Sequence, residues 1–524
     1  MDFSAKNRSS QINEACSRHF DLTIIGGGIT GAGIALDACL RGMSVLLLEK
    51  NDFASGTSSK STKLIHGGLR YLKQLEFSLV REVGLERAIL HNLLPHLVVP
   101  EKMLLPIVKN GSLSSMTCAL ALSVYDYLAS VEKEDKKEML NPEKILSLEP
   151  LLSNTEDILG GAIYAEYRTD DARLTIELIK EAHKLGGVCL NHLEVIECIQ
   201  LDEGYSIQAR DNDSGKEIYF KTALIINAAG PWTDSIIKRQ GDLLSNKIFL
   251  SKGVHLVIDR SRLNLRQSIY FDIGDGRMMF AIPRLNKVYF GTTDTEYKGS
   301  LDSIEVTNAD CSYLIRALNS RFPSADITLN DIESCWAGLR PLIRKSNKSS
   351  TEMSRKDEVF IASNGIISIA GGKLTGFRKM AERVVDIAEK KLSGKKSKCT
   401  TAYHNFGSRI NANFTDSAYH NFTFGAAVSE ILNNEISGTK QALINEYIYC
   451  INEENCLTPL DYFLRRSGKM YFDIKAVKKE LELCLSTFKS QLDWSEERVE
   501  KERIKVNDSI EIHSLAKIKE ASKT

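Results

Sequence analysis

The sequence has no overall charge imbalance. Its 524 residues include 68 Lys plus Arg and 68 Asp plus Glu, so the formal net charge is zero. Binding of nucleic acid or strong attraction to anionic lipid normally needs a basic excess, and the composition supports neither. We therefore expect no nucleic-acid partner, and any cationic binding site has to be local.

Long apolar runs and a secretion signal are also missing. Residues 1–20 are polar and lack the apolar core of a signal peptide, so we expect a mobile polar leader there. No uninterrupted apolar run approaches the ~20 residues of a transmembrane helix. The two nearest candidates, Leu93–Val108 and Met116–Leu128, are interpreted as buried core. Any contact with a membrane would then be peripheral.

Closely paired cysteines are absent as well. Eleven cysteines are scattered from Cys16 to Cys484 without a CxxC motif, and the closest two are Cys450 and Cys456. Isolated cysteines are typical of small buried side chains in a reducing compartment. The pattern predicts a cytoplasmic protein without a metal cluster.

The chain is long enough for two or three domains. Leu22–Ile25, Ile29–Arg41 and Val45–Leu48 read as strand, helix and strand, which predicts a βαβ unit in a parallel sheet. Residues 251–340 contain short β-rich runs separated by turn residues, which favours an antiparallel sheet carrying a helix at Asn308–Arg321. Residues 401–524 are mostly helical in pattern.

A nucleotide-binding fingerprint lies inside the βαβ unit. Gly26, Gly28 and Gly31 form GxGxxG directly after a strand and at the start of a helix, where free N–H groups attract a pyrophosphate. Glu49 ends the next strand and is placed to accept a hydrogen bond from a ribose hydroxyl. A carboxylate at this position favours FAD or NAD over NADP.

Three further glycine-rich segments favour FAD over NAD. They are Gly56–Tyr71, Ile226–Trp232 and Ala370–Arg378. The last places a glycine pair at a helix start, where amides could stabilise the negative charge of a reduced flavin. Several such turns along one chain suit a long, buried cofactor, although each alone could be a structural turn.

Taken together, these segments resemble the FAD-dependent glycerol-3-phosphate dehydrogenase family, in the branch found in Gram-positive bacteria. The segments that carry the resemblance are Thr57–Leu72, Glu166–Leu174, Asn227–Trp232, Lys252–Val257, Phe290–Tyr297, Trp336–Leu342 and Ala370–Glu382. The family implies an α/β fold: a Rossmann-like FAD-binding domain of the D-amino-acid-oxidase type, an antiparallel substrate domain and a helical C-terminal domain. We expect the FAD-binding part at about 21–90, 160–250 and 345–395, the substrate part at 251–344 and the helical domain at 401–524.

The resemblance also implies the site residues. FAD contacts are expected at Gly26, Gly28, Gly31, Glu49, Lys50, Thr57, Ser58, Ser61, His66, Gly67, Gly68, Gly230, Gly371, Gly372, Lys373, Leu374 and Thr375. Substrate and phosphate contacts are expected at Arg70, Tyr71, Arg340 and Lys373, with Thr292 and Arg378 as further candidates. A small phosphodianion needs such cationic donors, because guanidinium groups pair with phosphate oxygens.

Two histidines have a functional setting. His255 lies in a strand-like segment, where a histidine is as readily a satisfied core residue as a proton acceptor; we carry it forward as a candidate catalytic residue. His66 is expected to support the flavin.

The implied reaction is oxidation of sn-glycerol 3-phosphate to dihydroxyacetone phosphate, with hydride transfer to FAD and electrons passed to a membrane quinone. A glycerophosphate oxidase that reduces oxygen to hydrogen peroxide would share every substrate residue and remains open. Two more distant interpretations are an amine oxidase of the same fold and a silent flavin-binding scaffold. A peripheral position on the inner face of the cell membrane and a homodimer are also left open.

Overall fold

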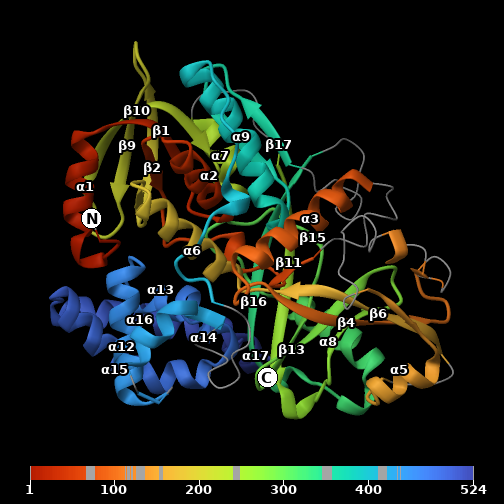
Figure 1. Ribbon diagram of the computed structural model, residues 1–524. Coiled ribbons are helices and arrows are strands. Elements are labelled where there is room, and N and C mark those ends of the chain that lie inside the picture. Colours follow the sequence, from red (N-terminus) through yellow and green to blue (C-terminus); the bar gives the residue numbers. More distant parts are fainter. Residues whose placement is uncertain are drawn as a thin grey trace.

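The computed structural model shows two sheets side by side with a group of helices below the first (Figure 1). It describes residues 2–66, 77–112, 114, 118–119, 122–124, 136–152, 157–239, 248–344, 357–410, 422–433, 435–436 and 438–522. Within these residues, no helix is both long and apolar enough to cross a lipid bilayer.

The first sheet has eight strands and a parallel centre. Its main path runs β17-β18-β10-β1-β2-β7, and β8 and β9 are attached beside β10. The strands are β1 (His19–Ile25), β2 (Val45–Leu48), β7 (Val188–Leu190), β8 (Leu193–Gln200), β9 (Tyr205–Asp211), β10 (Glu217–Asn227), β17 (Asp357–Ile361) and β18 (Ile367–Gly371). β1 pairs in parallel with both β2 and β10, so the predicted parallel βαβ unit is confirmed.

Three long helices pack around the first strands. They are α2 (Ile29–Leu40), α6 (Asp171–Lys184) and α9 (Phe377–Ser393). α2 and α9 approach closely because Gly33 has no side chain: a Cβ there would lie 2.8 Å from the Phe377 ring. Their apolar faces join the buried strand residues Leu22 and Ile24 in one core. This core holds the start of α2 rigidly against β1.

The second sheet has ten strands. Its path runs β15-β11-β14-β13-β12-β4-β6-β3, with β16 on β11 and β5 on β6. The strands are β3 (Leu64–Ile65), β4 (Val99–Val108), β5 (Glu138–Leu140), β6 (Ile158–Arg168), β11 (Ile248–Asp259), β12 (Ser268–Asp272), β13 (Met278–Arg284), β14 (Lys287–Gly291), β15 (Thr295–Glu296) and β16 (Ile332–Ile343). The predicted antiparallel sheet is confirmed at β11, β12, β13 and β14.

The second sheet is larger than predicted. β4 and β6 pair with each other over most of their length and belong to this sheet, although residues from 160 on were assigned to the FAD-binding part. An apolar run does not say which sheet it joins, since both sheets bury one face. The boundaries of the two parts otherwise stay a prediction. The interpretation of Leu93–Val108 as core agrees with the buried Leu104 and Leu105 of β4.

The expectation of a mobile leader at residues 1–20 is wrong. Residues 8–17 form helix α1 (Arg8–Ser17), whose Ile12 and Ala15 are buried against the first sheet. Arg8 donates a hydrogen bond to the Asp211 carboxylate over 2.8 Å. The polar sequence concealed this helix because only a narrow face of it is covered.

The remaining helices include a C-terminal group, drawn in blue in Figure 1. Outside this group lie α3 (Phe77–Leu93), α5 (Pro142–Leu148), α7 (Thr233–Arg239) and α8 (Asn308–Arg321). The C-terminal group contains α11 (Val428–Leu432), α12 (Lys440–Glu453), α13 (Pro459–Asp461), the π-helical turn η12 (Tyr462–Arg466), α14 (Lys469–Phe472), α15 (Ile474–Leu492), α16 (Glu496–His513) and α17 (Ala516–Ala521). The predicted helix starts at Thr458 and Ser495 are confirmed, since both side chains cap a helix.

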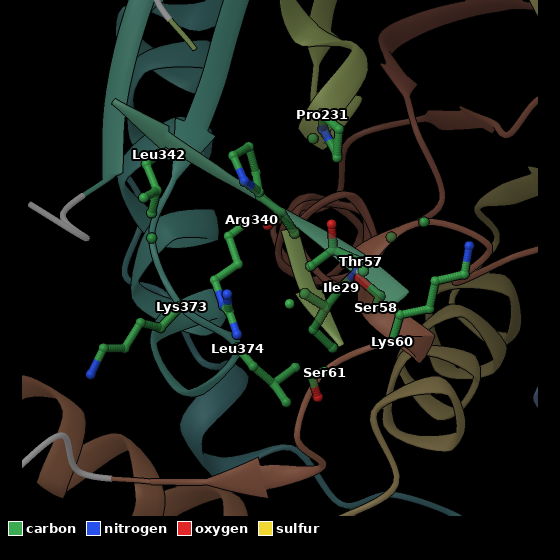
Figure 2. Close-up of a pocket in the computed structure, with 18 of the residues that line it drawn as sticks. Ile29, Thr57, Ser58, Lys60, Ser61, Pro231, Arg340, Leu342, Lys373 and Leu374 are labelled. Atoms are coloured by element: carbon green, nitrogen blue, oxygen red, sulfur yellow. The ribbon is translucent and has the colours of Figure 1, made fainter. Parts of the chain in front are cut away.

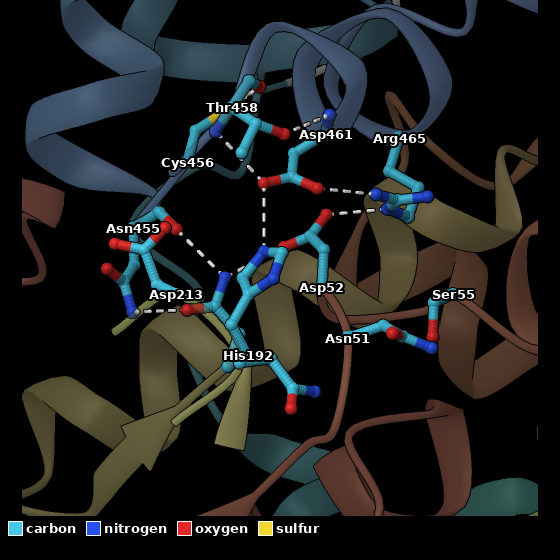
Figure 3. A network of polar contacts seen from close by, with 12 residues as sticks. Asn51, Asp52, Ser55, His192, Asp213, Asn455, Cys456, Thr458, Asp461 and Arg465 are labelled. Atoms are coloured by element: carbon cyan, nitrogen blue, oxygen red, sulfur yellow. Dashed lines mark hydrogen bonds and ion pairs between the residues drawn. The ribbon is translucent and has the colours of Figure 1, made fainter. Parts of the chain in front are cut away.

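Buried charges join the C-terminal helices to the first sheet (Figure 3). Asp52, in the loop after β2, accepts hydrogen bonds from Arg465 over 2.6 Å and from Arg466 over 2.7 and 3.0 Å. Asp461 accepts from Arg465 and contacts His192 Nε2 at 3.1 Å. Burial alone would raise the pKa of Asp52, but the two guanidinium groups outweigh it and hold that pKa below its usual value. The carboxylate therefore stays charged and fixes the loop to the C-terminal helices.

Candidate active site

One large cavity of about 1010 Å³ lies where the carboxyl ends of β1 and β10 meet the second sheet. Its wall combines the glycine turn before α2, the loop at 55–62, the turn at Gly230 and the segment Gly371–Thr375 with residues of β11 and β16. Ligands of open parallel sheets bind outside the carboxyl ends of the strands, which is where this cavity opens. Figure 2 shows how these distant segments converge.

The glycine turn is shaped for close approach of a ligand. Gly26 has φ +110°, a conformation that side chains disfavour. Gly28 is the N-cap residue of α2, and a Cβ there would lie 3.1 Å from Ser58 Oγ. The first N–H groups of a helix have no acceptor within the helix, so the start of α2 can receive a pyrophosphate.

Glu49 is buried at the same end of the cavity. Its carboxylate accepts hydrogen bonds from the backbone N–H of Gly27 over 2.8 Å and of Asn51 over 2.9 Å. Burial raises the pKa of Glu49, and these hydrogen bonds oppose that rise. A carboxylate can accept about four hydrogen bonds, so Glu49 can also accept one from the predicted ribose hydroxyl. The ribose contact itself stays a prediction.

A second glycine turn lines the same cavity. Gly371 and Gly372 have φ +80° and +76°, which turns the chain from β18 into the short helix that precedes α9. Thr375 donates a hydrogen bond to the backbone oxygen of His66 over 3.3 Å. The N-terminus of α2 and the glycine turn at Gly371–Thr375 thus line one cavity, and the helix N-terminus favours a ligand with negative charge.

Most of the predicted cofactor residues line this cavity. Those that do are Gly26, Gly28, Glu49, Lys50, Thr57, Ser58, Ser61, His66, Gly230, Gly371, Gly372, Lys373, Leu374 and Thr375. Gly31 lies behind the wall, where a Cβ would sit 1.9 Å from the Gly26 oxygen, so its role is helix–strand packing. Gly67, Gly68, Arg70 and Tyr71 lie outside the described residues. The donors and the shape of the cavity fit FAD.

Arg340 reaches the cavity from β16. Its guanidinium donates to Thr292 Oγ1 over 3.0 Å and to the Thr293 oxygen over 3.2 Å, and it lies 3.6 Å from the Asp294 carboxylate. Figure 2 shows this side chain extended toward Leu374 among the cavity residues. The predicted pair Arg340 and Thr292 is therefore brought together. Gly253 permits this arrangement, since a Cβ there would lie 2.4 Å from Arg340 Nη2.

His255 lines the cavity from β11, next to β16. Its Nε2 lies 3.0 Å from Thr62 Oγ1, which also faces the cavity, whereas Nδ1 is buried. Burial first, and then the charges of Arg340 and Lys63, hold the pKa of His255 well below its usual value. The imidazole is therefore neutral at pH 7, with Nε2 paired to the Thr62 hydroxyl in the cavity wall.

The two remaining candidates differ in their outcome. Lys373 lines the cavity, although in Figure 2 its amine points away from Arg340. The prediction that Arg378 contacts the substrate is wrong, because Arg378 does not line the cavity. It lies on α9 and donates two hydrogen bonds to Glu86, over 2.8 and 2.5 Å. The sequence could not reveal this partner, which is 292 residues away. Arg378 holds α3 against α9.

Three residues in or next to the site were not predicted from the sequence: Thr62, Trp336 and Gly253. Trp336 stands four residues before Arg340 on β16, so alternation along a strand places both side chains on one face. A glycine within a strand often marks a close approach of another group, which is the signal that Gly253 carried. Thr62 gave no signal, because its partner His255 is supplied by a distant strand.

Comparison with known proteins agrees with this site. Residues 21–378 match the family of FAD dependent oxidoreductases, and residues 369–499 match the C-terminal domain of alpha-glycerophosphate oxidase. The chain is 41% identical to the aerobic glycerol-3-phosphate dehydrogenase of Bacillus subtilis, over 96% of this chain and 97% of the relative. It is 42% identical to the enzyme of the same name from Staphylococcus saprophyticus, over 96% of each chain.

Solved structures give the same result. The glycerol-3-phosphate dehydrogenase from Bacillus halodurans, complexed with FAD, superposes with a TM-score of 0.82 at 38% identity over 98% of each chain. The L-alpha-glycerophosphate oxidase from Mycoplasma pneumoniae shares the fold, with a TM-score of 0.58 at 19% identity over 76% of this chain and all of the other. The cofactor of this protein is FAD. The chain belongs to the FAD-dependent oxidoreductases and, within them, to the aerobic glycerol-3-phosphate dehydrogenase family.

Proposed function

We propose that this protein oxidises sn-glycerol 3-phosphate to dihydroxyacetone phosphate and passes the electrons to a membrane quinone. The observation that carries the proposal is the position of Arg340 and His255 in the cavity that fits FAD. A phosphate-binding cation and a neutral base lie on adjacent strands, β16 and β11. The names of the Bacillus and Staphylococcus relatives support the same substrate.

The guanidinium of Arg340 binds the phosphate and orients the substrate. Thr292 Oγ1 and the Thr293 oxygen each accept one of its hydrogen bonds, and these contacts hold the guanidinium at the cavity wall. A guanidinium held in place loses little entropy on binding, so it defines the orientation of the secondary alcohol. Arg70, Tyr71 and Lys373 are proposed as further phosphate contacts.

His255 accepts the proton of the secondary hydroxyl at Nε2. The imidazole is neutral because burial and the nearby cations Arg340 and Lys63 depress its pKa. A bound phosphate dianion opposes the charge of Arg340, so substrate binding raises the pKa of His255 and makes it a stronger base. FAD, when bound, supplies the acceptor for the hydride that leaves the alcohol carbon.

Anaerobic addition of sn-glycerol 3-phosphate to the FAD-loaded protein tests the substrate. Rapid loss of the visible flavin absorption is expected, with no loss on addition of glycerol or the opposite enantiomer. A flavin that stays oxidised would refute the proposal and direct attention to amine substrates. The acceptor is tested separately: quinone reduction supports the dehydrogenase, whereas stoichiometric hydrogen peroxide in air would identify an oxidase.

The proposed location is the cytoplasm, with peripheral contact at the inner face of the membrane where the quinone lies. Sedimentation with lipid vesicles that contain quinone tests this contact. Light scattering of the purified protein distinguishes a monomer from a homodimer.

A further inference from the structure

Trp336 is fully buried between His255 and the C-terminal helices. Its indole ring stacks on the imidazole of His255, with ring centroids 4.9 Å apart and 15° between the planes. The two residues are directly opposite each other in the pairing of β11 with β16, so both rings lie on the same face of the sheet. The indole N–H donates to the oxygen of Ser61 over 3.2 Å. Trp336 therefore contacts both His255 and the loop that lines the cofactor cavity.

The C-terminal group supplies the other side of the pocket around Trp336. Tyr471 and Phe472, on α14, have ring centroids 5.4 and 5.6 Å from that of Trp336. The hydroxyl of Ser334, on the same strand as Trp336, donates to the backbone oxygen of Tyr471. Tyr471 and Phe472 thus pack against Trp336, and Trp336 in turn packs against His255.

The position of α14 is itself fixed by cations from the rest of the protein. The guanidinium of Arg284 lies 4.1 Å from the ring centroid of Phe472, and the amine of Lys63 lies 5.6 Å from that of Tyr471. Cation–π contacts of this kind are strongest where water is excluded, as it is here. The aromatic rings of α14 therefore have little freedom to move away from Trp336.

The orientation of His255 depends on this packing. The contact between Nε2 and Thr62 Oγ1 holds one point of the ring, and a single hydrogen bond does not fix the ring plane. Tyr289, at 6.5 Å between ring centroids, and the backbone of Gly291 also flank the ring, but Trp336 makes the nearer, stacked ring contact and restricts that plane. If Tyr471 or Phe472 were shortened, the indole could relax into the space left behind and the imidazole could tilt with it.

We propose that Tyr471 and Phe472 are positioning residues for the reaction, which act on His255 through Trp336. The C-terminal group would then be a structural part of the active site, although neither residue touches the cofactor cavity. This inference rests on the proposed role of His255 as proton acceptor. Misplacement of a catalytic group by about 1 Å can lower a rate by about 100-fold, so contacts remote from the substrate can matter this much.

The test compares variants of the full-length, FAD-loaded protein. Phe472→Leu and Tyr471→Leu shorten the two rings, and Tyr471→Phe keeps the ring but removes the hydroxyl. Phe488→Leu is the matched control, because Phe488 is a buried aromatic residue of the same helical group that packs on Trp494. Stopped-flow measurement of anaerobic flavin reduction by sn-glycerol 3-phosphate gives the limiting rate and the apparent Kd. Competition by inorganic phosphate reports the Arg340 site, and absorbance reports bound FAD.

We expect Phe472→Leu and Tyr471→Leu to lower the limiting rate by about 10- to 100-fold, with unchanged phosphate competition and full FAD content. Tyr471→Phe and Phe488→Leu should reduce their flavin at the wild-type rate. Wild-type rates in both leucine variants at positions 471 and 472, or an equal loss in Phe488→Leu, would overturn the proposal.

His255→Asn separates this proposal from the one on which it rests. If His255→Asn reduces its flavin at the wild-type rate, the proton-accepting role fails and the positioning role fails with it. If His255→Asn is slow while both leucine variants are fast, only the positioning role is refuted.

Discussion

A single added methyl group at Gly253 is expected to damage the proposed phosphate site at Arg340 while leaving the fold intact. In Gly253→Ala the new Cβ would lie 2.4 Å from Arg340 Nη2, 2.8 Å from Cζ and 2.6 Å from Thr292 Oγ1. The guanidinium has to move by about 1 Å to restore ordinary contact, and it can do so cheaply because it ends a flexible side chain. The unfolding free energy should therefore fall by no more than about 1.5–3 kcal/mol for each hydrogen bond that the guanidinium gives up, which leaves the protein folded.

The functional cost of that displacement is much larger. Moving the guanidinium breaks its hydrogen bonds to Thr292 and Thr293 and misaligns it with the phosphate. Hydrogen bonds to charged groups are worth about 1.5–3 kcal/mol each, and a 1 Å misplacement can cost about 100-fold in rate. We expect Gly253→Ala to lose about 10- to 100-fold in kcat/KM for sn-glycerol 3-phosphate.

Steady-state kinetics and thermal unfolding together check this prediction. Arg340→Ala serves as the reference for a lost phosphate contact, and it should retain FAD while its KM rises steeply. Gly376→Ala is the matched control, since a Cβ there meets no atom within 4 Å. The reasoning would be refuted if Gly253→Ala kept wild-type kinetics. It would also be refuted if thermal unfolding showed that the variant is already unfolded at the assay temperature.

Three other changes test the cofactor turn and the C-terminal contacts. Gly31→Ala would place a Cβ 1.9 Å from the Gly26 oxygen, so the turn must open and FAD should be lost on gel filtration, whereas retained FAD would contradict the assigned packing. Arg466→Met leaves the buried Asp52 carboxylate with one fewer partner and should cost about 3–5 kcal/mol in denaturant unfolding; Lys475→Met, which removes an exposed ion pair with Glu333, should be close to wild type. The pKa of His192 is raised, since the Asp461 carboxylate outweighs the effect of burial, so the protonated imidazole stabilises the fold fully below its usual pKa of about 6.5 and less as pH rises through the raised value. The difference in melting temperature between wild type and His192→Gln should therefore shrink as the pH rises above about 6.5, and a constant difference would refute this ion pair.

The sequence by itself determined the local part of the nucleotide site. Gly26, Gly28 and Glu49 belong to one βαβ unit, where spacing along the chain fixes spacing in the structure. The same holds for the glycine pair before α9 and for the capped helix starts at Thr458 and Ser495. In each case the interacting groups lie in the same or consecutive elements, 22 residues apart for Gly27 and Glu49 and only a few residues apart at the helix starts, so local pattern and turn chemistry are sufficient.

The tertiary structure alone decided which distant side chains meet. Arg378 was expected to contact the substrate, yet it pairs with Glu86 of α3 and does not line the cavity. The polar residues 1–20 suggested a mobile segment, yet Ile12 and Ala15 find an apolar surface on the first sheet. Both outcomes depend on surfaces that distant parts of the chain supply, whose proximity no local pattern encodes.

The active site combines features set by the local sequence with features set by the tertiary structure. The glycine turns and Glu49 follow from the local sequence, whereas the stack of Trp336 on His255 and the packing of Tyr471 on Trp336 depend on the tertiary structure. The physical reason is that strand and turn geometry follow from neighbouring residues, while burial and ion pairing depend on which surfaces are brought together when the whole chain is packed.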